Sequence, residues 1–172
     1  MKGPVVLIGM MGSGKTSVGG ELARRLDWPW MDLDQALERR FKRSVAEQFK
    51  RDGERVFRRR ERDLLRELCV SGPRVLSAGG GVVLDASNRA LLKKRTTVYL
   101  QAAPRFLVER LKGTQAGLRP LLRAPDGDIG TLLRLMAARR APLYRSCARI
   151  TVRASQGTAS AVAERILKRL GA

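Results

Sequence analysis

Five short apolar runs alternate with longer amphipathic stretches along this chain of 172 residues. The runs are strand-sized and rich in Val, Ile and Leu, as expected of strands buried on both faces of a sheet. Strands are expected at residues 4–9, 29–32, 74–78, 97–101 and 149–152. Alternation of such strands with helices predicts an α/β fold with a parallel sheet.

Between these runs, apolar residues recur at helical spacing. Helices are expected over residues 15–26, from 33 onward, and over 54–69, 86–93, 104–112, 129–140 and 159–170. Ser44 and Glu47 have the spacing of a capping box, which predicts a further short helix after Ser44. Glycines and prolines recur within about 113–130, so a mobile lid is expected there. The length fits one domain over residues 1–172.

Residues 9–16 read Gly-Met-Met-Gly-Ser-Gly-Lys-Thr, directly between the first apolar run and the first helical pattern. This is a complete phosphate loop in the strand–loop–helix context that the motif requires, and an ordinary glycine-rich turn would not match every fixed position. Backbone N–H groups of such a loop surround phosphate oxygens, the lysine reaches the β- and γ-phosphates, and the threonine reaches Mg²⁺. The expected ATP contacts are therefore Gly12, Ser13, Gly14, Lys15, Thr16 and Ser17.

The composition changes this picture in two ways. There is no histidine, so a proton acceptor must be a carboxylate. The net charge is +19, which suits nucleic acid, but also small anions such as ATP and phosphorylated or carboxylated metabolites. Aromatic residues make up only 5% of the chain, and many arginines lie at helical i,i+3 and i,i+4 spacing from acids, so no specific nucleic-acid partner is expected.

No signal peptide or membrane span is recognisable, and the two cysteines, Cys69 and Cys147, are far apart in the sequence. A cytoplasmic protein with reduced thiols is expected.

Two carboxylates follow the second expected strand. Asp32 and Asp34 are two apart, which on an extended segment points both side chains the same way, toward the ligand crevice at the carboxyl edge of a parallel sheet. One would serve the metal and the other a substrate hydroxyl. The alternative is that either one caps the next helix.

Three further clusters suggest substrate contacts. Arg58 and Glu61 are three apart on a helix, so the acid can hold the guanidinium toward a substrate carboxylate; the alternative is a surface ion pair. Residues 79–81 are three glycines after the third strand, where a close backbone approach to a ligand competes with a loose loop. The third cluster places Arg119 in the candidate lid and Arg140 at a helix end.

These motifs, in this order, resemble the shikimate kinase family over essentially the whole chain. The resemblance rests on the phosphate loop and on Asp32-x-Asp34, Gly53-Glu54-x-x-Phe57-Arg58, Gly79-Gly80-Gly81, Arg119-Pro120-Leu121-Leu122 and Arg140-x-Pro142-Leu143-Tyr144. It implies a three-layer P-loop kinase fold with five parallel strands in the order 2-3-1-4-5 and helices on both faces. It also implies transfer of the γ-phosphoryl group of ATP to the 3-hydroxyl of shikimate, with Mg²⁺ as cofactor and ATP and shikimate as partners.

The resemblance implies roles for individual residues. Lys15, Asp34 and Arg119 would be catalytic, with Asp34 as the base, and Thr16 and Asp32 would hold the metal. A substrate-binding region of about 33–61, with residues after it, would supply the substrate contacts Asp34, Phe57, Arg58, Gly80, Gly81 and Arg140. Phe49 would extend the apolar wall, and Glu61 would support Arg58.

On the nucleotide side, the resemblance implies that Arg110 lies against the adenine, that Arg119 covers the phosphates and that Arg153 contributes. Ser77 would serve the water shell of the metal. One departure is Ser146, where the family often has Glu. Two alternatives stay open: a related sugar-acid kinase, and a basic nucleotide-dependent RNA-binding protein whose only support is the charge. A monomer with no membrane association is expected.

Overall fold

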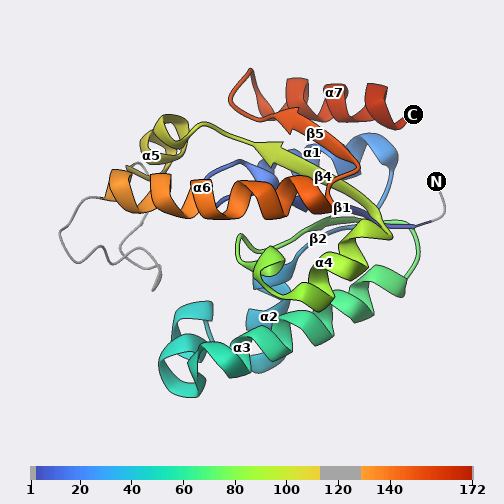
Figure 1. The fold of residues 1–172 in the computed structure, drawn as a ribbon. Helices are drawn as coiled ribbons and strands as arrows, with labels where there is room; N and C mark the ends of the chain where they lie inside the picture. Colours follow the sequence, from blue (N-terminus) through green and yellow to red (C-terminus); the bar gives the residue numbers. More distant parts are fainter. Residues whose placement is uncertain (1–2, 113–128, 172) are drawn as a thin grey trace.

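The computed structural model describes residues 3–112 and 129–171. Arg119 and the expected lid, apart from its last two residues, lie outside these ranges. Five parallel strands form one sheet in the order β2-β3-β1-β4-β5 (Figure 1), which confirms the expected fold class. The strands are β1 (Val5–Ile8), β2 (Trp30–Asp32), β3 (Val75–Ser77), β4 (Thr96–Gln101) and β5 (Ile150–Arg153).

Helices cover both faces of the sheet and complete three layers (Figure 1). One face is covered by α1 (Lys15–Leu26) and α7 (Ala159–Leu170). The other face carries α2 (Leu33–Phe41), α3 (Val45–Val70), the short 3₁₀ helix η1 (Val82–Leu84), α4 (Ala86–Lys93), α5 (Pro104–Lys112) and α6 (Ile129–Cys147).

The central strand shows why the apolar runs are continuous rather than alternating. Val5 and Leu7 belong to the core under α1 and α7, whereas Val6 and Ile8 belong to the core on the opposite face. All four side chains are completely buried. Because successive strand residues point to opposite faces, both faces of β1 must be apolar.

The capping box at Ser44 is present. The Ser44 backbone N–H donates to Glu47 Oε2 at 2.8 Å, and the Glu47 N–H donates to Ser44 Oγ at 3.2 Å. The short helix that it opens runs directly into the long basic one, and the two form α3 with a break at Gly53, whose φ is 78° and ψ 162°. A positive φ is readily adopted by glycine alone, so Gly53 sets the position of the break.

Helix α6 is longer than the pattern predicts. Its expected end at residue 140 is wrong, because the helix continues through Pro142 to Cys147. Proline removes one helical hydrogen bond. That loss is offset because Tyr144 and Cys147 are buried, and Tyr144 stacks on Tyr99 with ring centroids 5.0 Å apart. Within the described ranges, no helix combines the length and apolar character that crossing a membrane requires.

Candidate active site

The phosphate loop joins β1 to α1 at the carboxyl edge of the sheet. Gly12 and Gly14 have φ values of 78° and 89°, which the loop requires and other residues rarely adopt. No side chain caps the N-terminus of α1, so its first N–H groups face outward, as anion binding requires. The Lys15 ammonium donates to the carbonyls of Gly9 and Met10, each at 2.9 Å, and so lies over the loop.

Two hollows flank this loop. One, of about 200 Å³, is lined by Ser13, Gly14 and Ser17 of the loop and first turn, and by Phe106 and Arg110 of α5. The other, of about 440 Å³, lies on the opposite side of the loop, at Met11. Its further lining residues are Asp34, Glu38, Ser44, Val45, Ala46, Phe49, Phe57, Arg58, Glu61, Gly80, Gly81 and Arg140. The arrangement provides two small-molecule sites that meet at the phosphate loop.

The two carboxylate oxygens of Asp32 have different partners. Its Oδ1 accepts from the N–H groups of Asp34 at 3.0 Å and Gln35 at 3.3 Å, which caps α2. Its Oδ2 accepts from Thr16 Oγ1 at 3.1 Å. The helix-cap interpretation and the metal-ligand interpretation of Asp32 are therefore compatible, because the cap uses only one carboxylate oxygen.

Thr16 and Asp32 form an oxygen-donor pair beside the phosphate loop, which is the donor chemistry that Mg²⁺ prefers. The described residues contain no cluster of three or more His, Cys, Asp or Glu side chains able to hold a metal.

The premise that Asp32 and Asp34 lie on one extended segment is wrong. Asp34 lies in the first turn of α2 rather than on an extended segment. Its carboxylate reaches the larger hollow, where Oδ1 would be 2.9 Å from a Cβ built on Gly79. The helix thereby separates the two carboxylates, with Asp32 beside Thr16 and Asp34 at the larger hollow.

Arg58 forms an ion pair with Glu61. Arg58 Nη1 donates to Glu61 Oε2 at 2.8 Å, and the guanidinium also contacts the exposed Glu54 at 3.3 Å. Burial raises the pKa of Glu61, an effect that the neighbouring Arg58 charge opposes. Burial of Arg58 tends to lower its pKa, but Glu61 and Glu54 outweigh this and the pKa of Arg58 is raised. The expected ion pair is therefore present, and Arg58 remains a cation.

Two aromatic rings border this guanidinium. The Phe49 and Phe57 ring centroids are 4.5 Å apart, and Arg58 Cζ lies 5.6 and 5.4 Å from them. Phe57 is buried, so the rings form a firm apolar wall beside the charge.

The glycines of residues 79–81 provide space rather than unusual backbone angles. A Cβ on Gly81 would lie 2.5 Å from both terminal nitrogens of Arg58. A Cβ on Gly79 would lie 2.9 Å from Asp34 Oδ1 and 3.0 Å from Glu61 Oε1. Side chains at these positions would displace the charged groups of the hollow, whereas a close approach of this backbone to a ligand stays a prediction.

Two side chains of α6 converge on the carbonyl of Gly80. Arg140, only 7% exposed, donates from Nη1 at 3.2 Å, and the Tyr144 hydroxyl donates at 2.5 Å. Burial raises the pKa of Tyr144, so its hydroxyl keeps its proton. Ser146 lies in the last turn of α6 and donates to the Leu143 carbonyl at 2.9 Å, so it takes no part in holding Arg140.

Ser77 makes two hydrogen bonds within the fold, and the role implied for it at the water shell of the metal stays a prediction. Ser77 Oγ donates to the Lys15 carbonyl at 3.0 Å and accepts from Trp30 Nε1 at 3.2 Å. The buried hydroxyl therefore ties β2 and β3 to the first turn of α1. Its single proton is already donated within the fold.

The nucleotide-side arginines are less closely tied to the site. Arg110 lies beside the loop, since a Cβ on Gly14 would be 3.0 Å from its Nη1, and it lies over the Phe106 ring with 5.5 Å to the centroid. Arg153 directly precedes the lining residue Ala154, and its carbonyl accepts from Arg165 Nη2 at 3.1 Å. Arg119 lies outside the described residues.

Sequence reasoning singled out neither Met11 nor Glu38 as residues of the larger hollow. A signal for Glu38 was available, because it is four residues after Asp34 and so lies on the same face of α2. Glu38 Oε1 accepts from the Val45 N–H at 2.9 Å, which joins α2 to the start of α3.

A phosphate loop between two small-molecule hollows, at the carboxyl edge of a parallel sheet with order 2-3-1-4-5, defines a P-loop kinase of small molecules. Comparison with known proteins narrows this class. The family model SKI, described as shikimate kinase, matches residues 11–171. The chain belongs to the shikimate kinase family, whose members are ATP-dependent phosphotransferases with an alcohol acceptor.

Individual relatives are similar to this chain over nearly its full length. The shikimate kinase of Symbiobacterium thermophilum is 38% identical over 167 residues, covering 96% of this chain and 95% of that protein. The shikimate kinase of Mycobacterium tuberculosis H37Ra is 41% identical over 165 residues, covering 96% and 92%. A solved structure of the Acinetobacter baumannii shikimate kinase in complex with shikimate has a TM-score of 0.91 and 36% identity, covering 98% of this chain and 92% of that one.

Proposed function

We propose that this protein transfers the γ-phosphoryl group of ATP to the 3-hydroxyl of shikimate, which yields shikimate 3-phosphate and ADP. The observation that carries the proposal is the larger hollow, where Asp34, Arg58 and Arg140 surround Gly80 and Gly81 beside the phosphate loop. The carboxylate of Asp34 suits an acceptor hydroxyl, and the guanidiniums of Arg58 and Arg140 suit an acceptor carboxylate. The family match favours this acceptor over that of a sugar-acid kinase.

In this proposal Arg58 and Arg140 hold the shikimate carboxylate. A guanidinium can donate two parallel hydrogen bonds to a carboxylate, and Glu61 keeps that of Arg58 in one orientation. Gly80 and Gly81 let the ring and its hydroxyls come close to the backbone, and Phe57, with Phe49, forms the apolar wall. The acceptor is thereby fixed relative to the loop before the reaction.

Asp34 is the proposed general base. Its carboxylate lies in the larger hollow, and the chain has no histidine to take that role. It would orient the attacking hydroxyl and accept its proton as the phosphoryl group is transferred.

The nucleotide phosphates would lie on the N–H groups of Gly12, Ser13, Gly14, Lys15, Thr16 and Ser17, with the Lys15 ammonium on the transferring group. Arg110 and Arg153 would border the nucleoside, and Arg119 would cover the phosphates. Thr16 and Asp32 would hold Mg²⁺, which when bound neutralises charge on the phosphates.

The test is ADP release by the purified protein with ATP, Mg²⁺ and one acceptor at a time. Shikimate should support turnover, whereas its methyl ester, which has no carboxylate charge, and gluconate should support little. Lys15→Ala should lower kcat/KM for shikimate by several orders of magnitude while the protein stays folded. Efficient turnover of gluconate in preference to shikimate would instead support the sugar-acid kinase.

A further inference from the structure

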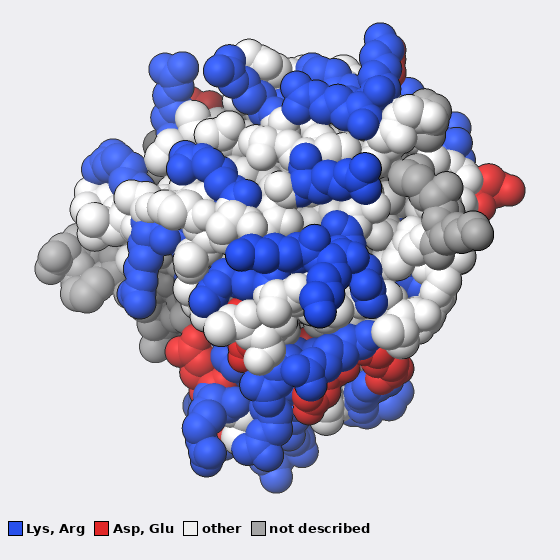
Figure 2. Space-filling view, turned by 45° about the vertical axis from the view of Figure 1, so that its right-hand side comes forward, with Lys and Arg blue, Asp and Glu red and all other residues white. Residues whose placement is uncertain are grey.

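Two segments that lie far apart in the sequence form a surface without carboxylates. Residues 86–108 and 129–163 contain no Asp or Glu, and they include α4 and α6, which lie side by side in the outer layer (Figure 1). The carboxyl-terminal parts of these helices and the residues that follow carry Arg89, Lys93, Lys94, Arg95, Arg139, Arg145 and Arg149. Blue side chains cross the middle of this face in Figure 2, whereas red ones gather below, toward α3.

Some basic residues elsewhere in the described part of the chain have an acidic partner. Glu21 binds Arg24 and Arg25, Glu67 binds Arg40, and Glu164 binds Lys168. The charge on those surfaces is partly neutralised within the fold. None of the seven basic residues named for the α4 and α6 face forms an ion pair with an acid of residues 3–112 or 129–171.

This face contains a hollow of about 420 Å³ at the amino edge of the sheet. Its cationic lining residues are Lys93, Lys94, Arg95 and Arg149, and Thr96 and Ser146 add hydroxyl groups. Thr96 begins β4 and Arg149 directly precedes β5, so the hollow lies at the edge opposite the phosphate loop. It is therefore separate from both hollows of the active site.

Favourable interactions with helix C-termini account for only some of these basic residues. Helices α4 and α6 both end at the hollow, and a cation near a helix C-terminus is favourable. Arg95 has this role, because it donates to the Cys69 carbonyl at 3.1 Å and to the Lys94 carbonyl at 3.2 Å. The side chains of Lys93, Lys94 and Arg149 form no hydrogen bond or ion pair with any residue of 3–112 or 129–171. All three side chains are exposed, and a bound anion would lower their mutual repulsion.

We propose that this hollow binds a small molecule that carries several phosphate groups. Lysine ammonium groups and arginine forks both donate to phosphate oxygens, and four cations suit a multivalent anion better than a single carboxylate. The lining has no aromatic side chain, and the nearby Tyr99 and Tyr144 are buried. Stacking platforms for the bases of single-stranded nucleic acid are thus missing here, which favours a small phosphate compound.

The test is a titration of the ¹⁵N-labelled protein with inorganic tripolyphosphate, followed by amide chemical shifts. Residues 93–96 and 146–149 should shift together along one saturation curve. Amides of the phosphate loop should shift along a second, independent curve, because that loop also binds phosphate groups. The two regions are resolved separately, so the result for the hollow does not depend on the proposed kinase function.

A charge-matched pair of variants separates a site from general attraction. Lys93→Gln/Lys94→Gln/Arg149→Gln should raise the Kd read at 93–96 and 146–149 by roughly tenfold or more, because three phosphate contacts are removed. The control Arg24→Gln/Arg39→Gln/Lys168→Gln removes the same charge elsewhere and should change that Kd by only about twofold. The curve for the phosphate loop should be similar in both variants.

Three outcomes would overturn the proposal. The first is equal weakening in both variants, which would mean that only net charge attracts the anion. The second is no saturable shift at 93–96 and 146–149. The third is tighter binding of a short RNA oligonucleotide than of tripolyphosphate at the same hollow, which would assign the surface to nucleic acid.

Discussion

Arg58 Nη1 donates to Glu61 Oε2 across 2.8 Å, and the Glu61 side chain is only 1% exposed. A carboxylate so deeply buried has almost no water to bind, so its orientation and that of the guanidinium depend on each other. The second acid on Arg58, Glu54, is more than half exposed and contributes little. Glu61 therefore determines where the Arg58 fork points in the larger hollow.

Arg58→Lys should weaken shikimate binding. Lysine preserves the charge but loses the planar fork, and we expect a loss of about 1.5–3 kcal/mol, the range for hydrogen bonds to charged groups. Calorimetric titration with shikimate and with ATP measures this, and the affinity for ATP should hardly change. The neighbouring exposed Arg59, changed to Lys, is the control. Unchanged shikimate affinity in Arg58→Lys would remove this arginine from the acceptor site.

Gly81→Ala should impair the same site without unfolding the protein. Gly81 has a φ of −95°, which alanine adopts readily, but the new methyl group would lie 2.5 Å from the Arg58 nitrogens. The guanidinium has to move, so the KM for shikimate should rise.

The matched control is Gly20→Ala in α1, where nothing lies within 4 Å of the new Cβ. It should leave the KM unchanged and stabilise the helix by up to about 1 kcal/mol. Steady-state kinetics and urea unfolding of both variants measure these effects. A KM for Gly81→Ala equal to that of the wild type would show that Arg58 can shift without consequence.

Asp34→Asn should lower kcat because the amide keeps the shape but cannot accept a proton. We expect a loss of roughly 10²–10⁴-fold, with ATP affinity preserved. Asp32→Asn should instead raise the Mg²⁺ concentration needed for half-maximal activity, since Asp32 Oδ2 accepts a hydrogen bond from Thr16, the other proposed metal ligand. If Asp34→Asn were silent and Asp32→Asn abolished turnover at saturating Mg²⁺, the base would be wrongly assigned.

Asp85 should contribute to stability in a pH-dependent way. Its Oδ1 accepts from the N–H groups of Ser87 at 2.7 Å and Asn88 at 3.0 Å, which caps α4, and its Oδ2 accepts from Arg62 at 3.2 Å. Burial alone would raise the pKa of Asp85, but the two N–H bonds and Arg62 outweigh it and lower the pKa. At neutral pH, Asp85→Ala should cost about 1 kcal/mol of unfolding free energy, as for other lost caps.

The lowered pKa of Asp85 determines in which direction the stability changes with pH. The stabilisation by the Asp85 charge is present above the pKa of the unfolded chain, about 4, and is lost as the pH falls through the lower folded pKa. Asp85→Asn retains a capping side chain but lacks the charge. Urea unfolding should therefore show wild type and Asp85→Asn converging in acid, and a constant difference between them would contradict the prediction.

Helices α3 and α6 show which structural features local sequence signals predict and which depend on tertiary packing. The Ser44 capping box and the i,i+3 spacing of Arg58 and Glu61 are readable from the sequence, since both depend only on neighbours along one helix. The joining of two helices at Gly53 and the extension of α6 through Pro142 were not. The extension depends on the burial of Tyr144 and Cys147 against distant residues, which local propensity does not contain.

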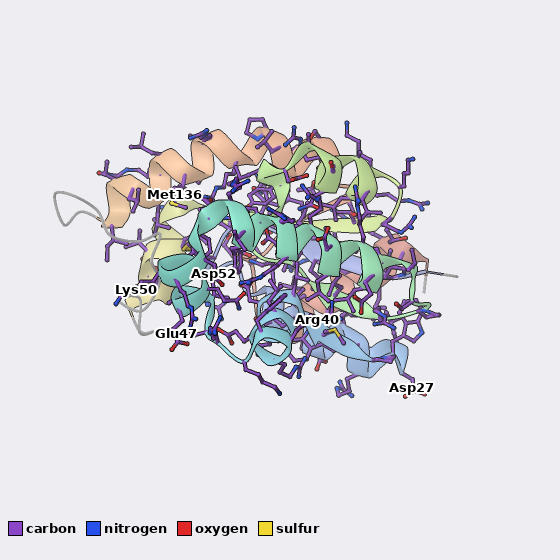
Figure 3. All side chains as sticks on the ribbon, turned by 90° about the horizontal axis from the view of Figure 1, so that it is seen from below. Asp27, Arg40, Glu47, Lys50, Asp52 and Met136 are labelled. Atoms are coloured by element: carbon purple, nitrogen blue, oxygen red, sulfur yellow. The ribbon has the colours of Figure 1, made fainter. Side chains whose placement is uncertain are left out.

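The sequence by itself determined the alternation of strands and helices, the sheet order through its resemblance to a family, and the phosphate loop, because each is specified by short-range spacing or by an ordered set of motifs. Only the tertiary structure decided which groups meet. The first turn of α2 places Asp34 at the larger hollow, whereas Asp32 contacts Thr16. Helices α2 and α3 lie in front in the view of Figure 3. Packing of α4 beside α6 brings Lys93 and Arg149 to one hollow. Such encounters depend on how elements pack across long sequence separations, so no local pattern contains them.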